Sequence, residues 1–493
     1  MNRKAVQLWE RRDHDGALRE FRQLALRTRT AVAWVDYAKA LALTWQGCRA
    51  AEAFGTARRV GPAAAVDQAA ANCLLGMRRY DLALEFLERV RAAGQAQAPH
   101  IAGLVVALDR AGRTDEAQEM LTEGLQRFGP LPELQLLRAK LMSRRAENAE
   151  ESLTALELLL ERGASDDSMA SAVHYARAAC CQKLGRFAEV FPALRLAKQP
   201  LLAAHRATLE QSTRSLDGLL EQVRTLTREN LRSWRERQGS SAQSLGLITG
   251  FPRSGTTLLE VILGSHERVV VSSEAPVFSD FIIAPQWDSH RAGPPDWSEP
   301  PQSKRLAERY WRLHEGNVGP LGDRVLIDKN PALTPLLGHF LNVLPEGRVL
   351  FCLREPKDVL LSCFMQELPV NNVSVHFLEW GQSWHCFSRC MEIWLRLRDL
   401  LDEGFLEIRY ERLVADHGEV AREVLDFLGL PESPQVADYR LRAAERGVYS
   451  PTYAEVREPV QAGAVGRWTR HPEQFGIPDG VPLDSPLGRE LGY

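Results

Sequence analysis

Hydrophobic and polar positions follow different patterns in the two halves of the chain. Up to about residue 200, apolar residues recur at the spacing of amphipathic helices, and strand-like runs are almost absent. Beyond residue 244, short apolar runs alternate with helical patterns, which is typical of a parallel sheet covered by helices on both faces. We therefore predict an α/β domain there, with strands at 245–249, 269–272, 324–327, 348–353 and 405–408 and helices at 256–265, 356–366, 376–401 and 418–428.

A small residue recurs at a near-constant interval through the helical half. The steps are 33, 33, 34, 38 and 33 residues, between Ala17, Ala50, Ala83, Ala117, Ala155 and Ala188. A period of about 34 residues is typical of tetratricopeptide helix pairs, which stack because one pair cannot bury its apolar face alone. We expect these alanines at close helix contacts. The predicted organisation is an all-α solenoid over 1–200, a connecting helix or linker over 201–243 and the α/β domain over 244–493.

Two roles stay open for the predicted solenoid. Its concave face can bind a peptide or protein partner, or the solenoid can only support the second half and a homodimer. We favour the first role. An ordinary helical bundle is the structural alternative, and the six near-equally spaced alanines disfavour it.

The first predicted strand of the α/β domain leads into a glycine loop and then a helix. Gly250 and Gly255 bound this loop, and the helix begins at Thr256. Such a turn binds phosphate because backbone N–H groups converge there and the helix dipole adds partial positive charge. The spacing matches the ATP-binding P-loop, but Thr256 stands where that motif has lysine, and Arg253 supplies the cation instead. The sequence predicts an anion site at Arg253, Ser254, Gly255, Thr256 and Thr257.

Further polar residues follow the other predicted strands, where ligands of such sheets bind. Glu274 follows the second strand and can be a first-turn helix acid or a general base. Lys329 follows the third strand and is either a turn residue or a cation facing the cleft. Arg354 follows the fourth strand, and Ser362 lies on the next helix. Arg354 either forms an ion pair, or it binds a phosphate together with Ser362.

With these blocks in this order, residues 245–470 resemble the sulfotransferases that use 3'-phosphoadenosine-5'-phosphosulfate (PAPS). The resemblance is closest to the tyrosylprotein sulfotransferase branch and its soluble tetratricopeptide-fused relatives. It implies a P-loop-like sulfotransferase fold whose loop at 252–257 binds the 5'-phosphosulfate. It also implies that Arg354 and Ser362 bind the 3'-phosphate, that Glu274 is the catalytic base and that Lys329 stabilises the transition state.

The same resemblance extends to later residues. Tyr410 matches a position that contacts the nucleotide, and the segment 452–468 matches a loop that closes over it. Within this loop, Thr452 takes a place that assists the transition state, and Arg467 replaces a nucleotide-binding lysine.

The resemblance implies transfer of a sulfuryl group from PAPS to a hydroxyl or phenol, with adenosine 3',5'-bisphosphate (PAP) as product and no metal. A tyrosine in a peptide or protein is the first candidate acceptor; a carbohydrate, lipid or small phenol stays open. The proline-rich, aromatic loop at 285–300 is either a lid or acceptor wall, or a passive insertion. Two alternatives remain: a nucleotide-dependent kinase, and a solenoid scaffold carrying an inactive transferase domain.

Composition narrows the remaining functions. The 61 Lys and Arg against 64 Asp and Glu give a net charge of −3, which gives no support for bulk nucleic-acid or membrane binding. No apolar run approaches the ~18 residues of a membrane span, and the N-terminus has no apolar core of signal-peptide length. The eight cysteines form no Cys-x2-Cys pair, so we expect core thiols, no metal site and a cytoplasmic location.

Overall fold

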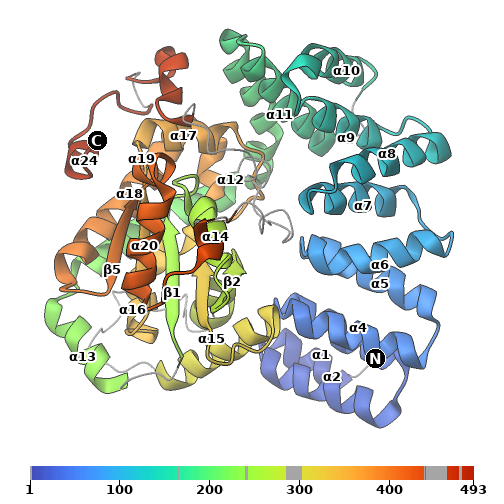
Figure 1. Cartoon of the computed structure of the whole chain (residues 1–493), viewed down its shortest axis with the longest axis horizontal. Helices are drawn as coiled ribbons and strands as arrows, with labels where there is room; N and C mark the ends of the chain where they lie inside the picture. Colours follow the sequence, from blue (N-terminus) through green and yellow to red (C-terminus); the bar gives the residue numbers. More distant parts are fainter. Residues whose placement is uncertain are drawn as a thin grey trace.

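A computed structural model gives the architecture of the chain (Figure 1). It describes residues 3–163, 166–238, 243–284, 303–437, 439, 464–476 and 480–493, and the statements below concern these residues. An arc of helices occupies one side of the molecule and an α/β unit the other. No helix in the described ranges combines the length and the apolar character needed to cross a bilayer.

Consecutive helices of the arc pack side by side as hairpins. The first ten span α1 (Arg3–Glu10), α2 (His14–Thr28), α3 (Ala31–Leu43), α4 (Gly47–Val60), α5 (Ala63–Gly76), α6 (Tyr80–Ala92), α7 (Ala98–Arg110), α8 (Thr114–Phe128), α9 (Pro132–Met142) and α10 (Ala149–Glu161). They are followed by α11 (Asp167–Lys183) and α12 (Phe187–Arg224). The N-terminal half is therefore all-helical as predicted, whereas the tetratricopeptide assignment itself stays a prediction.

The predicted small-residue period holds for four of its six positions. Ala17, Ala50, Ala83 and Ala117 are completely buried, each at the fourth position of its helix. In α12 that position belongs to the buried Val190, and Ala188 is exposed, so the prediction for Ala188 was wrong. In α10 the equivalent residue is the buried Ser152, whereas Ala155 is only half-buried. The regular spacing of buried alanines therefore ends before the last helix pairs of the arc, where valine or serine occupies the equivalent position.

The second half contains the predicted parallel sheet. Its strands lie in the order β2-β3-β1-β4-β5, and all neighbours pair in parallel. The bounds are β1 (Leu245–Gly250), β2 (Val269–Ser273), β3 (Val325–Lys329), β4 (Arg348–Leu353) and β5 (Phe405–Arg409). Each strand lies within two residues of its predicted range, because short buried runs followed by polar turns are strong local signals. The edge strand β2 lies nearest the helical arc in Figure 1.

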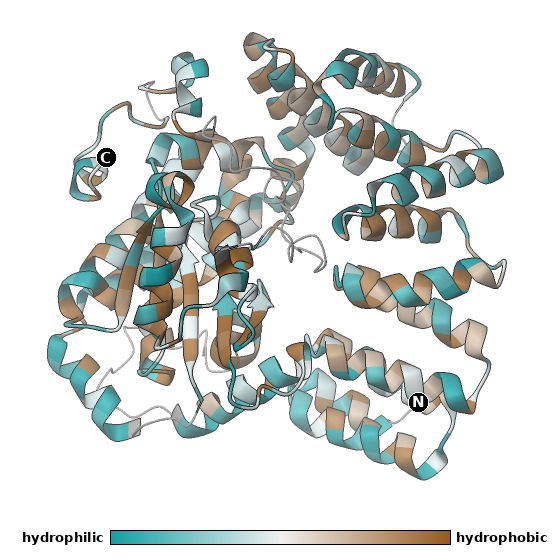
Figure 2. Ribbon diagram, in the orientation of Figure 1, coloured by the Kyte–Doolittle hydropathy of each residue, from teal (hydrophilic) through white to brown (hydrophobic). Residues whose placement is uncertain are grey.

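Helices cover both faces of this sheet. One face packs on α14 (Thr256–Gly264), α20 (His417–Leu428) and α21 (Pro434–Ala437), and the other on α16 (Leu337–Val343), α17 (Pro356–Met365) and α18 (Trp380–Leu400). Beside them lie α15 (Ser303–Val318), α19 (Tyr410–Ala415) and α24 (Pro486–Glu490). Hydrophobic residues gather on the strands and on one side of most helices (Figure 2). Burial of these two apolar layers holds the strand ends in fixed positions.

A single long helix passes from the arc into the α/β half. The helix α12 runs through residue 200 and bends at His205, where φ is −115° and ψ is 16°. It is followed by α13 (Arg228–Gln238). The predicted linker at 201–243 thus contains the second part of α12 together with α13.

The N-terminal end of the arc contacts the α/β half mainly through polar groups, which we call the polar dock. Two ring contacts lie beside them, because His14 meets Phe281 and Trp45 packs on the hydrophobic cluster of the α/β half. Arg312 Nη2 donates to Asp15 Oδ2 at 2.7 Å, and Arg79 Nη1 donates to the backbone oxygen of Asn317 at 3.1 Å. Asn317 Nδ2 in turn donates to Ser272 Oγ at 3.2 Å on β2. The first helices are therefore connected to the edge strand of the sheet.

The other end of the arc contacts the α/β half through aromatic side chains, which we call the apolar junction. Phe191 of α12 stacks on Phe364 with a centroid distance of 5.2 Å and meets Trp380 edge-on at 5.4 Å. Lys198 lies buried beside them, and its Nζ donates to the backbone oxygen of Phe377 at 2.7 Å. The helices α10 to α12 share one hydrophobic cluster with the sheet, and the helices up to α8 have a cluster of their own. The helix α9 contributes residues to both clusters.

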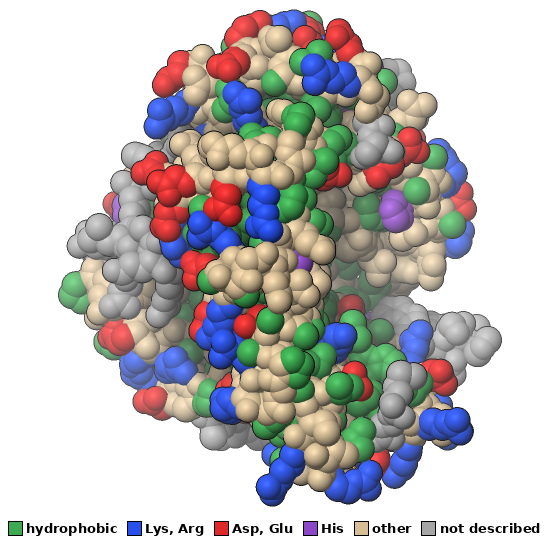
Figure 3. All heavy atoms as spheres, turned by 90° about the vertical axis from the view of Figure 1, so that its right-hand side faces the viewer, with side chains coloured by type: hydrophobic (Ala, Val, Ile, Leu, Met, Phe, Trp, Pro, Cys, Tyr) green, Lys and Arg blue, Asp and Glu red, His purple; other side chains and the backbone are tan. Residues whose placement is uncertain are grey.

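The outer face of the arc carries charges of both signs. In Figure 3, Lys and Arg side chains are interspersed with Asp and Glu over the upper and middle parts of this face. This mixture agrees with the near-neutral net charge of −3. It does not present the single-sign field that would attract a polyanion.

Candidate active site

The glycine loop between β1 and α14 is shaped by two close backbone approaches. Gly250 has φ +134°, and a Cβ there would lie 2.3 Å from the backbone oxygen of Cys352. Gly255 has φ +97°, and a Cβ there would lie 2.6 Å from the ring of Tyr410. Glycine is therefore required at both positions, which confirms the tight turn that the sequence predicts.

The loop presents the N-terminus of α14 as an anion site. The helix begins at Thr256, and its N-cap residue Gly255 has no side chain that could cap it. The first N–H groups of a helix have no partner within the helix, so Thr256 and Thr257 offer theirs outward. The Ser254 hydroxyl donates to the backbone oxygen of Phe251 at 2.7 Å and holds the loop in shape.

Two arginines and a serine meet beside this loop. Arg253 Nε donates to Ser362 Oγ at 2.9 Å, and Arg354 Nη1 donates to the backbone oxygen of Arg253 at 3.0 Å. The Arg354 guanidinium lies 4.2 Å from the ring centre of Tyr410. The structure thus brings together four residues that stand up to 157 positions apart, all of which the sequence assigned to nucleotide binding.

One buried atom of this cluster lacks a hydrogen-bond partner. Arg354 is only 8% exposed, yet its Nε makes no hydrogen bond to a described residue. A buried guanidinium N–H without a partner is costly. A phosphate oxygen would satisfy it and would be bound strongly, because both groups are charged. The residues present therefore fit a phosphorylated ligand.

A lysine lies between two carboxylates at the end of β3. Lys329 ends β3 and is completely buried. Its Nζ lies 2.5 Å from Glu274 Oε1 and 2.9 Å from Glu260 Oε2. The backbone N–H of Glu274 also donates to the Lys329 oxygen at 2.7 Å, so both chain segments are fixed at the strand ends.

The two carboxylates differ in exposure and in backbone conformation. The Glu274 side chain is 45% exposed, whereas that of Glu260 is 8% exposed. Glu274 also has φ +51°, which a non-glycine residue adopts at some energetic cost. Such conformations persist where the surrounding structure holds them, often at functional sites. Glu274 therefore faces solvent from a held position.

Burial and charge oppose each other at Lys329. Burial lowers the pKa of Lys329, but Glu260 and Glu274 outweigh it, so the net pKa of Lys329 is raised. Burial raises the pKa of Glu260, and Lys329 offsets only part of that rise, so the net pKa of Glu260 is raised. The three charged groups sum to −1, which favours retention of protons throughout the cluster. Lys329 is therefore a cation in the folded protein.

Sequence reasoning missed Glu260. Its signal was present, because a single carboxylate interrupts the apolar run of residues 258–263 on a helix that packs against the sheet. A carboxylate at such a position is almost never buried without a partner.

The comparisons with known proteins agree with this geometry. Residues 247–434 match the model of the sulfotransferase family. An uncharacterized protein of Aquifex aeolicus is 28% identical over 234 residues, which are 45% of this chain and 30% of that protein. Protein-tyrosine sulfotransferase A of Caenorhabditis elegans is 24% identical over 274 residues, which are 50% of this chain and 66% of that protein. The chain thus spans less than two thirds of either relative.

Over the matched residues, the second half of the chain is similar to the sulfotransferase family. Among solved structures, the sulfotransferase domain of the Synechococcus PCC 7002 olefin synthase is 20% identical, with a TM-score of 0.39, covering 53% of this chain and 98% of that domain.

The described end of the loop predicted to close over the nucleotide is anchored to the sulfotransferase domain. The backbone N–H groups of Gly466 and Trp468 donate to the Asp358 carboxylate at 2.6 and 2.8 Å. Arg354 Nη2 donates to the Ala464 oxygen at 2.6 Å. Arg467 therefore lies on a segment tied to Arg354, and its contact with a nucleotide stays a prediction. Thr452 and the loop at 285–300 lie outside the described residues.

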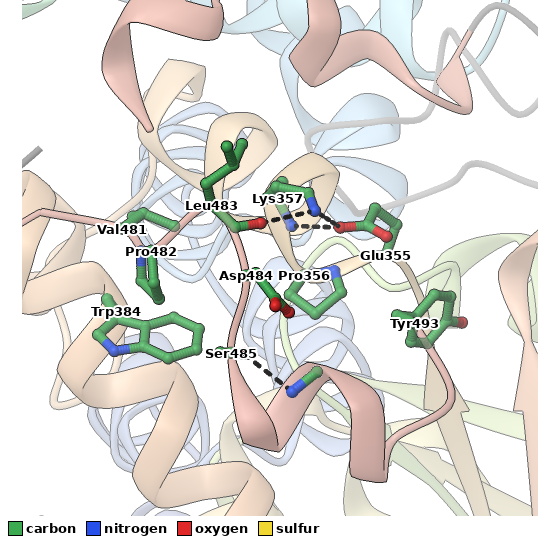
Figure 4. Close-up of a pocket in the computed structure, with 11 residues that line it drawn as sticks. Glu355, Pro356, Lys357, Trp384, Val481, Pro482, Leu483, Asp484, Ser485 and Tyr493 are labelled. Atoms are coloured by element: carbon green, nitrogen blue, oxygen red, sulfur yellow. Dashed lines mark hydrogen bonds and ion pairs between the residues drawn. The ribbon is translucent and has the colours of Figure 1, made fainter. Parts of the chain in front are cut away.

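A small pocket near the end of the chain is separate from this site. It encloses about 30 Å³ beside the start of α17 and is lined by Glu355, Lys357, Trp384, Leu483 and Tyr493, among others (Figure 4). This volume holds roughly one water molecule. None of the residues predicted for the active site lines it.

Proposed function

We propose that the protein is a sulfotransferase that moves a sulfuryl group from PAPS to a hydroxyl or phenol. The observation that carries the proposal is the buried Lys329 held against Glu274, on the strand next to the one that leads into the anion-binding loop. A carboxylate and a lysine beside the glycine loop support the proposal, because group transfer needs a base and a cation near the site that binds the phosphate.

Donor binding is assigned to the cluster around Arg354. The N-terminus of α14 and Arg253 would hold the 5' end of the nucleotide, and Arg354 with Ser362 would hold the 3'-phosphate. PAPS supplies the sulfuryl group, so the role of these residues is to bind and orient it. The unsatisfied Arg354 Nε supports this assignment.

Transfer is assigned to Glu274 and Lys329. Glu274 would accept the proton of the acceptor hydroxyl while the acceptor oxygen bonds to sulfur and the bond from sulfur to the phosphate oxygen breaks. Lys329 and the loop N–H groups would stabilise the negative charge that develops on the departing oxygen. The proton thus passes from the acceptor hydroxyl to the Glu274 carboxylate of this chain.

The acceptor we propose is a tyrosine of a peptide or protein. Support comes from the relatives named protein-tyrosine sulfotransferases, such as those of C. elegans and Drosophila melanogaster at 24% and 22% identity. Further support comes from the helical arc, which we propose to be a tetratricopeptide solenoid that guides the peptide. The segment after Glu274 contacts this arc, since the ring centres of Phe281 and His14 lie 5.8 Å apart.

Binding and transfer are tested separately. PAP should raise the melting temperature, since a ligand at 100 times its Kd adds about 2.7 kcal/mol, whereas ATP with Mg²⁺ should not. Transfer of ³⁵S from labelled PAPS to a panel of tyrosine peptides, phenols and sugars should then identify the acceptor. Glu274→Gln should fold and bind PAP but lose ~10²–10⁴-fold in turnover, while the exposed Glu346→Gln serves as control.

Each negative result points to a different alternative. Folded protein without affinity for PAP contradicts the proposal. Stabilisation by ATP with Mg²⁺ alone indicates a kinase. Binding of PAP with no transfer to any acceptor class indicates a scaffold with an inactive domain.

A further inference from the structure

The buried carboxylate of Glu260 has no part in the reaction as described so far. It lies on the second turn of α14, directly after the anion-binding loop, and is 6% exposed. Its carboxylate pairs with Lys329 at 2.9 Å, and the nearby Glu274 repels it. A buried carboxylate is expensive to retain, so its position against a reacting cation calls for a role.

The transfer step creates a specific electrostatic difficulty. In the structure the Lys329 ammonium forms ion pairs with both Glu274 and Glu260. When Glu274 takes a proton it becomes neutral and can no longer balance the ammonium. A completely buried lysine without a counter-charge tends to lose its proton, because burial disfavours the charged form. A neutral Lys329 would not stabilise the departing oxygen.

We propose that Glu260 is a positioning residue that holds the Lys329 ammonium from the side of α14, so that Glu274 can leave Lys329 and act as the base. This inference rests on the proposed sulfuryl transfer. Glu260 keeps Lys329 charged and in place while the other partner changes its protonation state. It touches neither the acceptor nor the donor in this role.

The local architecture favours such a division of labour. Glu274 follows an edge strand and its side chain is half-exposed, so it can turn toward a substrate. Glu260 is fixed on a helix packed among Leu259, Ile262 and Leu263, all of them fully buried. The movable carboxylate therefore faces solvent, and the fixed one faces the core.

Charge and geometry are separated with two substitutions. Glu260→Gln keeps the shape but removes the charge, and we expect kcat to fall by about 10- to 100-fold, while KM for PAPS and the affinity for PAP change less than threefold. The alkaline limb of the pH–rate profile should move to lower pH, because Lys329 loses one of the two carboxylates that raise its pKa. Glu260→Asp keeps the charge and should restore the alkaline limb toward that of the wild type.

A readout without turnover keeps the test independent of the acceptor. The chain has only eight lysines, so Lys329 can be assigned by NMR of lysine labelled at Cε, with Lys329→Arg identifying the signal. The pKa of Lys329 should drop in Glu260→Gln and stay unchanged in the matched control Glu267→Gln, an exposed carboxylate just beyond α14.

The outcomes distinguish this inference from the proposed function. Wild-type kcat and an unshifted Lys329 pKa in folded Glu260→Gln would overturn the inference alone. A loss of melting temperature and of PAP affinity without any shift of the alkaline limb would show a merely structural role and also overturn it. If the wild type transfers no sulfuryl group, the proposed function fails and this role fails with it, even where the Lys329 pKa responds.

Discussion

The helical arc contacts the sulfotransferase domain at two places that are built from different chemistry. At the apolar junction, Phe191, Phe364 and Trp380 interlock within one cluster that extends into the sheet. At the polar dock, Arg79 and Arg312 reach across to single polar groups. Aromatic burial stabilises by several kcal/mol, whereas partly exposed ion pairs contribute little. The arc therefore shares a hydrophobic core with the α/β half at one end and contacts it mainly through polar groups at the other.

This difference teaches how the arc can influence the active site. The dock connects Arg79 through Asn317 to Ser272, two residues before Glu274. Helix α15 comes close to the arc because Gly316 lies against Gln46, where a Cβ would be only 2.7 Å away. The contact that lies nearer to Glu274 along the chain is thus the weaker of the two.

The largest effect is expected from removing an aromatic ring at the apolar junction. Phe191→Ala should lower the free energy of unfolding by about 3–5 kcal/mol, because it leaves a cavity between α12 and α17. Urea denaturation should show loss of both the arc and the sulfotransferase domain.

The matched control is Phe54→Ala, which removes an equally buried ring from the separate cluster of the arc. It should destabilise the arc and leave PAP binding close to wild type. Equal loss of PAP binding in both variants would contradict the separation of the two clusters.

The next effect is a pH dependence that originates at Lys198. Burial lowers the pKa of Lys198 to about 7, well below its usual value of about 10.4 in an unfolded chain. Between these values the unfolded state binds the extra proton, so stability should rise with pH, by up to about 1.4 kcal/mol per pH unit. Lys198→Met should remove this slope, measured as urea unfolding free energies at pH 7, 8 and 9.

The exposed Lys39→Met provides the comparison for Lys198. It should leave the slope unchanged. Parallel stability curves for the wild type and Lys198→Met would mean that the junction lysine keeps its proton over this range.

A smaller effect is expected at the polar dock. Arg79→Ala removes charged hydrogen bonds to Asn317 and should cost about 1–2 kcal/mol. Hydrogen exchange should increase in α15 and β2 but not in α12 or α18. An increase of similar size in all four elements would show that the dock and the junction act as one unit.

The smallest effect is expected from Asp15→Asn. Asp15 pairs with Arg312, whose side chain is 52% exposed, and at 3.7 Å with Arg309. Because these ion pairs are partly exposed, they should together contribute no more than about 1 kcal/mol. High salt should reduce the difference from the wild type further. A cost above that of Arg79→Ala would contradict the ranking within the dock.

Much of the sulfotransferase half was predictable because its signals are local. Buried runs ending in polar turns located all five strands, and the parallel topology then placed Glu274, Lys329 and Arg354 at one edge of the sheet. Glu260 was missed because helical spacing alone does not show which face of α14 meets Lys329. The contact between Arg79 and Asn317 joins residues 238 positions apart and leaves no local pattern.

The helical half shows the opposite weakness of sequence reasoning. Its period indicated regular helix pairs, but the fourth position of α12 is Val190 instead of the expected alanine. A small residue is favoured there only where two helices approach closely, and larger side chains are accepted when the spacing opens. Counting alanines therefore shifted the assignment to the exposed Ala188.

The continuity of α12 determines where a fragment that contains the α/β half should begin. A fragment that starts at residue 244 would leave the surfaces of Phe364 and Trp380 open to water and prone to aggregation. A fragment that starts near residue 132 would retain α9 to α12, and Phe191 of α12 would continue to cover that surface. Helices α9 to α12 are thus better produced together with the α/β half than with the helices that precede them.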